Sequence, residues 1–137
     1  MMHSHKGAAQ YRTVRSHGLV ADASPTRLVQ IVFEQILSQL AIAHGCMERI
    51  KDNLPLSETV TKCAAMGKAI RLIGQLNGTL DMERGGEVAE KLRALYEYML
   101  LRLTLANAAN DTGIVVEVAN LVREIKIGWD GIVTDGR

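Results

Sequence analysis

Few residues in this sequence have the type and spacing that a chemical reaction needs. His44 is the only histidine within a helical pattern, and no helix offers it a second metal ligand at matching spacing. His3 and His5 form an HxH pair that could hold adventitious metal, but we expect them to be solvated. Cys46 and Cys63 lie 17 positions apart without a CxxC motif. Both cysteines fall in apolar helical patterns, so we expect two buried, reduced thiols.

Other patterns that carry catalysis are also missing from the sequence. No Glu is followed three positions later by His, which is the pair that di-iron carboxylate bundles use. No glycine-rich loop follows a predicted strand, and no Ser or Cys has a nearby His and carboxylate. We therefore expect no catalytic centre, no enzyme activity and no cofactor or metal. The function should depend on apolar surface instead.

The composition favours one soluble all-α domain. The 137 residues are 47% apolar but only 4% aromatic, with two prolines. Lys plus Arg number 16 and Asp plus Glu 15, a balance that argues against nucleic acid as the main partner. The N-terminus lacks a signal-peptide core, and no apolar run is long enough to span a membrane. We expect a cytoplasmic protein without membrane insertion.

Four helices are predicted between residues 24 and 133. Ser24 and Pro25 suit the start of the first helix, and the turn at Pro55 ends it. Ser57 is the expected cap of the second helix, and the third runs from about 87 to 110. Asp111 or Thr112 is expected to cap the last helix.

The connections between these helices are short, so consecutive helices should run antiparallel in an up-down-up-down four-helix bundle. Residues 1–23 lack periodicity and are expected to form a loosely docked N-terminal segment. The bundle should cover residues 24–133. Residues predicted to be mostly buried follow the helical spacing: Val29, Phe33, Ile36, Leu40, Ile70, Ile73, Tyr96, Met99, Leu103, Val118, Val122 and Ile125.

The third helix has two apolar rows instead of one. An offset of two positions places them roughly 200° apart on the helix. One row is Leu92, Tyr96, Met99, Leu103 and Ala106, and the other is Ala94, Tyr98, Leu101, Leu105 and Ala108.

The second helix is also predicted to have two rows, again offset by two positions and so on opposite sides of the helix. The core row is Cys63, Met66, Ile70, Ile73 and Leu80, and the second is Ala65, Ala69, Leu72 and Leu76. If both second rows bind a partner, their leucines should be more exposed than the core row: Leu72, Leu76, Leu101 and Leu105 against Ile70, Ile73, Met99 and Leu103.

A second apolar row has several explanations. It could pack under residues 1–23, form a homo-oligomer seam, or provide a groove for a partner helix. The second rows of the second and third helices could flank such a groove. The two rows could also be the edges of one wide apolar arc.

The order of motifs resembles the FliS-type flagellar export chaperones. The resemblance rests on Tyr11 in "AAQYRTV", then "ASPTRLVQIVFEQ", "LNGTLD", "GGEVAEKLRALYEYM", "RLTLANAAND" and a last helix ending in "IGWDGI". It covers residues 11–132, nearly the whole chain. Phe33 and Glu34 stand where the family commonly has Tyr-Asp or a similar pair, a change that keeps the aromatic ring and the acid.

The resemblance implies a non-enzymatic chaperone that binds the C-terminal segment of flagellin. It would prevent early polymerisation of flagellin and support type III export, with the export apparatus as a further partner. Tyr11 matches a residue that covers part of the groove when no client is present. We expect Tyr11 and Val14 to pack on the bundle in the free protein and to be displaced when the client binds. From periodicity we assign the client groove to five residues, Leu72, Leu76, Tyr98, Leu101 and Leu105. The chain should be a monomer or a weak homodimer, and the alternative is a self-associating structural or adaptor bundle.

Overall fold

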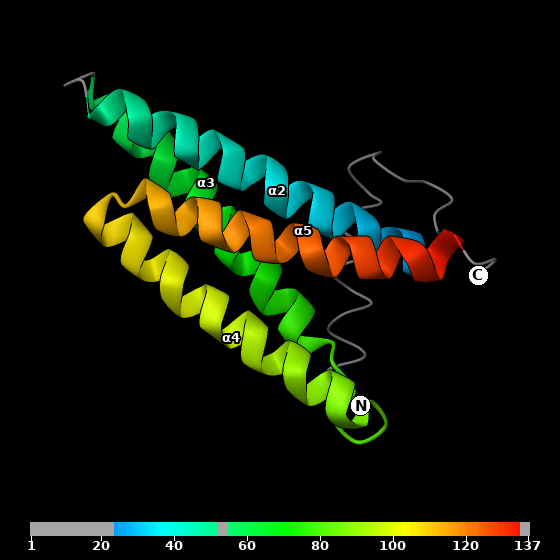
Figure 1. Ribbon diagram of the computed structural model, residues 1–137. Helices are drawn as coiled ribbons and strands as arrows, with labels where there is room; N and C mark the ends of the chain where they lie inside the picture. The colour runs from blue at the N-terminus through cyan, green and yellow to red at the C-terminus, as the bar shows by residue number, and fades with distance from the viewer. Residues whose placement is uncertain (1–23, 52–54, 135–137) are drawn as a thin grey trace.

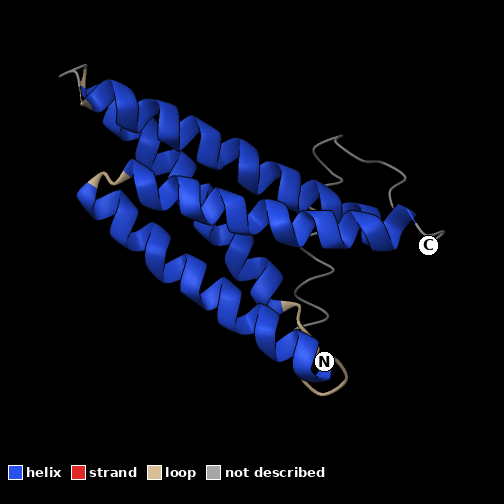
Figure 2. Ribbon diagram, viewed as in Figure 1, coloured by secondary structure: helices blue, strands red, loops and turns tan. Residues whose placement is uncertain are grey.

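The computed structural model describes residues 24–51 and 55–134. They form four helices, α2 (Pro25–Ile50), α3 (Leu56–Gly78), α4 (Gly86–Ala109) and α5 (Thr112–Thr134). The described residues include no strand (Figure 2). This confirms the predicted all-α four-helix bundle. Tyr11 and Val14, and with them the expected N-terminal segment, lie outside the described residues.

Each helix begins and ends where the local sequence favours it. The Ser24 side chain accepts a hydrogen bond from the Arg27 amide at 3.2 Å, and Pro25 is the first residue of α2. Asp111 accepts from the Ile114 amide at 3.1 Å, so it caps α5 as predicted. The prediction for Ser57 was wrong. Helix α3 already begins at Leu56, directly after Pro55, so Ser57 lies within its first turn.

The turn between α3 and α4 requires glycine. A Cβ atom at Gly85 would collide with the Ala89 side chain and lie 2.7 Å from the Asp81 carbonyl oxygen. Gly86 has a φ of +54°, which favours glycine over other residues. Asp81 supports the turn by accepting hydrogen bonds from the Glu83 and Arg84 amides. This turn fixes where α4 starts.

The helices form a ring in which each packs on two neighbours. Helix α2 packs on α3 and α5, and α4 packs on α3 and α5. Consecutive helices run antiparallel, and α4 and α5 diverge from the end where Asn110 and Asp111 join them (Figure 1). Because of this divergence, the start of α4 and the end of α5 are far less closely paired than the rest of the bundle.

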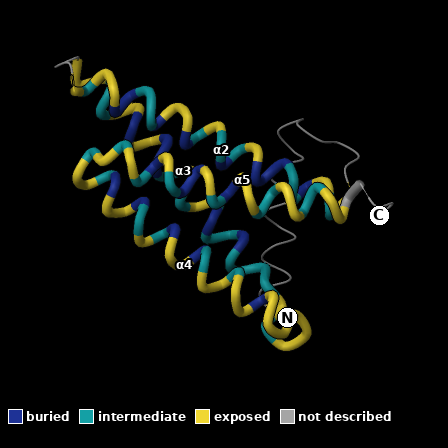
Figure 3. The backbone as a smooth tube through the Cα atoms, in the orientation of Figure 1, coloured by how far each residue is buried: buried dark blue, intermediate teal, exposed yellow. Residues whose placement is uncertain are grey.

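The core follows the predicted rows closely. Of the residues predicted to be mostly buried, nine are buried: Phe33, Ile36, Leu40, Ile73, Tyr96, Met99, Leu103, Val118 and Val122. The other three, Val29, Ile70 and Ile125, are partly buried against that core. Figure 3 shows the buried residues on the inner sides of the helices. Cys46 is buried as expected, but Cys63 is exposed, and that prediction was wrong.

Candidate client-binding surfaces

The outer row of α4 is an exposed apolar surface. It consists of Ala94, Tyr98, Leu101, Leu105 and Ala108, the second row identified in the sequence. Leu101 is 61% exposed, Leu105 47% and Tyr98 40%, whereas Met99 and Leu103 on the opposite side of the helix are fully buried. Exposed apolar side chains in a continuous row are typical of an interaction surface.

The second row of α3 is different, and the predicted exposure of Leu76 was wrong. Leu76 is only 4% exposed, Ala65 and Ala69 are buried, and Leu72 is partly buried against the core. The row lies one position, not two, from the core residues Met66, Ile70 and Ile73. One position is a turn of about 100°, so the two rows of α3 lie on adjacent sides of the helix.

Adjacent rows suit a helix with two neighbours. Helix α3 packs on α2 more extensively than on α4. On the side toward α4, Cys63 lies 3.8 Å from the side-chain oxygen of Asn107, and Lys62 donates to the Asn107 carbonyl at 2.9 Å. Ala65, Ala69 and Leu76 of the second row are all buried in the core cluster. The row therefore forms no exposed groove along α3, although Leu76 near the end of the helix also lines an apolar pocket.

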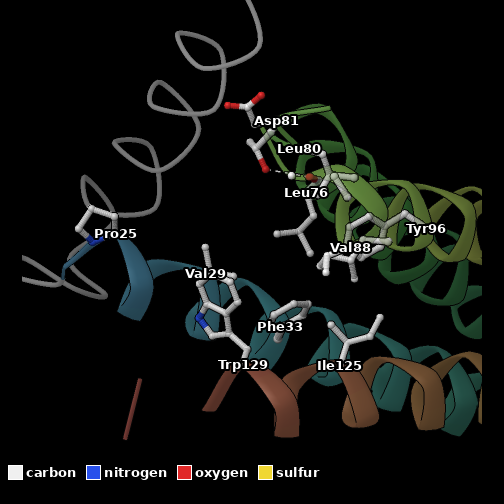
Figure 4. Close-up of a pocket in the computed structure, with 14 residues that line it drawn as sticks. Pro25, Val29, Phe33, Leu76, Leu80, Asp81, Val88, Tyr96, Ile125 and Trp129 are labelled. Carbon is white, nitrogen blue, oxygen red and sulfur yellow. Dashed lines mark hydrogen bonds between the residues drawn. The ribbon is translucent and has the colours of Figure 1, made fainter. Parts of the chain in front are cut away.

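A second candidate surface is an apolar pocket at the end of the bundle where α4 and α5 diverge, which we call the end pocket. Its volume is about 580 Å³. All four helices contribute to its lining, in Figure 4 with Val29, Phe33 and Trp129 on one side and Leu76 and Val88 on the other. A pocket of this size and character suits bulky apolar side chains.

Polar contacts between α2 and α5 form the frame of the end pocket. The Trp129 indole Nε1 donates to the Thr26 carbonyl at 2.9 Å. The Asp130 carboxylate accepts from the side-chain Nε2 of Gln30 at 2.7 Å and pairs with the Lys126 ammonium at 2.6 Å. These hydrogen bonds, first that from Lys126, hold the pKa of Asp130 below its usual value. They fix the side of the pocket that Trp129 lines.

A cluster of three polar side chains joins the outer row of α4 to α5. The Tyr98 hydroxyl donates to one carboxylate oxygen of Glu117 at 2.6 Å, and the Arg102 Nε donates to the other at 3.1 Å. The Arg102 guanidinium also lies 5.9 Å from the centroid of the Tyr98 ring. The hydrogen bond to Tyr98, followed by that from Arg102, lowers the pKa of Glu117, and the same bond raises the pKa of Tyr98.

The predicted site residues within the described part of the chain therefore fall into three groups. Tyr98, Leu101 and Leu105 share the exposed outer row of α4, where the sequence placed them. Leu76 lines the end pocket although little of it is exposed, while Leu72 does not line it. Sequence reasoning missed the end pocket, whose lining includes Val29, Leu80, Val88, Leu92 and Trp129. Trp129 belongs to the "IGWDGI" motif of the family resemblance, but periodicity alone could not indicate that it lines a pocket.

The described part of the chain contains neither a metal-binding cluster nor a membrane-spanning helix. Within it, no three His, Cys, Asp or Glu side chains come together to hold a metal ion. None of the described helices is long and apolar enough to span a membrane.

Comparison with known proteins identifies the family. The sequence matches the family described as flagellar protein FliS over residues 7–136. It is 46% identical over 131 residues to the flagellar secretion chaperone FliSB of Pseudomonas aeruginosa, covering 96% of this chain and 98% of the relative. It is 35% identical over 132 residues to the flagellar secretion chaperone FliS of Salmonella typhimurium, covering 96% and 93%. The chain therefore belongs to the FliS family of flagellar secretion chaperones.

Proposed function

We propose that this protein is a flagellar secretion chaperone that binds the C-terminal segment of flagellin. By covering that segment it prevents early polymerisation, and it delivers the subunit to the export apparatus. Family membership supports the chaperone role. The observation that carries the binding proposal is the outer row of α4, which exposes Tyr98, Leu101 and Leu105 opposite a buried core row.

The physical basis is a match between two apolar surfaces. A segment that polymerises through an amphipathic helix has an apolar face that must stay covered until assembly. The outer row presents anchors at spacings of three and four residues, the pattern that a helix-in-groove contact requires. The end pocket provides a second apolar surface on the inner side of α4, where Tyr96 of α4 and Leu76 of α3 both line it. We propose that the client uses both surfaces.

We further propose that Tyr11 and Val14 cover the end pocket when no client is present. Pro25, the first residue of α2, already lines the pocket, so the preceding residues are attached at its rim. Hydrogen exchange of residues 8–20 should then rise when a flagellin peptide binds. Unchanged protection of those residues at saturating peptide would remove the proposed cap.

The binding proposal is tested with a peptide of the flagellin C-terminal segment and two variants of α4. Leu101→Glu buries an unpaired charge in the proposed contact, which costs several kcal/mol, a loss of roughly a hundredfold or more in affinity. The control is Glu97→Lys, a charge change on an exposed residue that belongs to neither row, and it should bind nearly as the parent does. A folded Leu101→Glu protein that binds the peptide normally would place the client elsewhere.

The alternative is a self-associating bundle without flagellin-specific binding. The same exposed leucines would then form a seam between two copies of the chain. Light scattering separates the two readings, because the chaperone should form a complex of one chain and one peptide. A dimer that Leu101→Glu dissociates, and that the peptide leaves intact, would favour self-association.

A further inference from the structure

We infer that Glu117 of α5 is a positioning residue for the client surface on α4, and that it acts through Tyr98. This inference rests on the proposed function, because it assigns a role within the same surface. Glu117 does not belong to the outer row. Its carboxylate instead receives the Tyr98 hydroxyl at 2.6 Å and the Arg102 Nε at 3.1 Å.

The geometry restricts the Tyr98 ring. Because its hydroxyl is held by a residue of the neighbouring helix, the ring leans across the seam between α4 and α5 instead of extending into solvent. Arg102, one turn along α4, is held by the other carboxylate oxygen and lies 5.9 Å from the centre of the ring. The ring is therefore held at its hydroxyl by Glu117 and lies near the Arg102 guanidinium, while 40% of the residue remains exposed.

A fixed aromatic ring suits a binding surface better than a mobile one. An exposed side chain loses rotamer freedom when a partner covers it, and this loss weakens binding. Glu117 imposes that order before the client arrives. The role is one of preorganisation, so it requires no contact between Glu117 and the client.

The position of the cluster gives it a further consequence. Tyr98 and Arg102 lie just beyond Tyr96, the last α4 residue that lines the end pocket, on the way to the joined end of α4 and α5. The cluster therefore ties α4 to α5 between the end pocket and the connection at Asn110 and Asp111. Through it, the outer row keeps its orientation relative to the pocket.

The test measures peptide affinity in a double-mutant cycle. Glu117→Ala should weaken binding of the flagellin C-terminal peptide by about two- to tenfold, the effect of freeing one side chain. Tyr98→Phe, which removes the hydroxyl, should weaken it similarly. The double variant should bind like Glu117→Ala alone, because that change already removes the partner of the Tyr98 hydroxyl. A purely structural role of Glu117 would not produce this cancellation.

Two more variants complete the experiment. Glu117→Gln keeps an oxygen that accepts from the Tyr98 hydroxyl, so it should restore most of the affinity, and it serves if the alanine variant does not fold. Glu124→Ala removes an exposed acid seven positions further along α5 and should leave binding unchanged. Parent-like binding by Glu117→Ala, or additive losses in the double variant, would overturn the inference while leaving the proposed function intact. If the peptide fails to bind the parent protein, the proposed function itself is wrong, and the inference falls with it.

Discussion

Leu101 and Leu103 stand two positions apart on α4 and should respond in opposite ways to substitution. Leu101 is 61% exposed, and Leu103 is fully buried in the core. We predict that Leu101→Glu leaves the bundle folded and nearly as stable as the parent, whereas Leu103→Ala strongly destabilises it. Both leucines are in the middle of the same helix, so differences in helix position do not complicate the comparison.

The magnitudes follow from burial. Removing a fully buried leucine side chain costs about 2 to 5 kcal/mol, since apolar burial is lost and a cavity remains. An exposed substitution typically changes stability by about 0.5 kcal/mol or less. Glu is also about as favourable as Leu in a helix. Glu97, four positions earlier, adds a like-charge repulsion of about 0.2 to 0.5 kcal/mol. The total for Leu101→Glu therefore stays below about 1 kcal/mol.

Urea unfolding followed by circular dichroism measures both values. A small domain has a slope of about 1 to 3 kcal/mol per molar urea, so Leu103→Ala should lower the midpoint by about 1 M or more. Leu101→Glu should lower it by less than about half of that. A loss above about 2 kcal/mol for Leu101→Glu would mean that the outer row is part of the core, and the proposed client surface would have to be abandoned.

Three further predictions concern other parts of the molecule. Cys63 should react with a thiol reagent in the native protein, while buried Cys46, whose pKa is raised by burial, should react only in denaturant. Rapid reaction of both thiols under native conditions would contradict the fold. The folded-state pKa of Asp130 is lowered, so its contact with Lys126 stabilises the protein above the usual pKa of 3.8, and this stabilisation is lost as the pH falls further. The stability difference between the parent and Asp130→Asn should therefore shrink in acid. A difference that stays constant with pH would refute this prediction. Trp129 is the only tryptophan and lines the end pocket, so its emission should shift to the blue when the flagellin peptide binds; no change at saturation would place the client outside the pocket.

The α4 helix shows what periodicity can predict. Its two rows are two positions apart, which places them on opposite sides of the helix, and one side is buried while the other is exposed. Tyr98, Leu101 and Leu105 were therefore placed correctly from the sequence. The arithmetic needed no knowledge of the neighbouring helices, because opposite sides of one helix cannot both face a single core.

The α3 helix shows where the same reasoning fails. Its rows are one position apart, and the exposure of Leu76 was predicted wrongly because adjacent sides were treated as opposite ones. Careful counting from Ile73 could have avoided this error. The end pocket could not be predicted in this way. The pocket depends on how far α4 and α5 diverge. Its lining combines Val29 of α2, Val88 of α4 and Trp129 of α5.

The contact between Trp129 and Thr26 bears on chain connectivity. The indole of one reaches the backbone of the other across 103 positions of sequence, so the start of α2 and the end of α5 lie side by side. A circular permutant could link the end of α5 to the start of α2 and begin instead at Asp111, with Asn110 as its last residue. Because the four helices form a ring, this permutant should keep every contact between helices. Its new ends would lie where α4 now joins α5, at the far end of the bundle from the start of α2 and the end of α5 (Figure 1). Such a permutant would show whether the bundle folds without the chain segment that precedes α2.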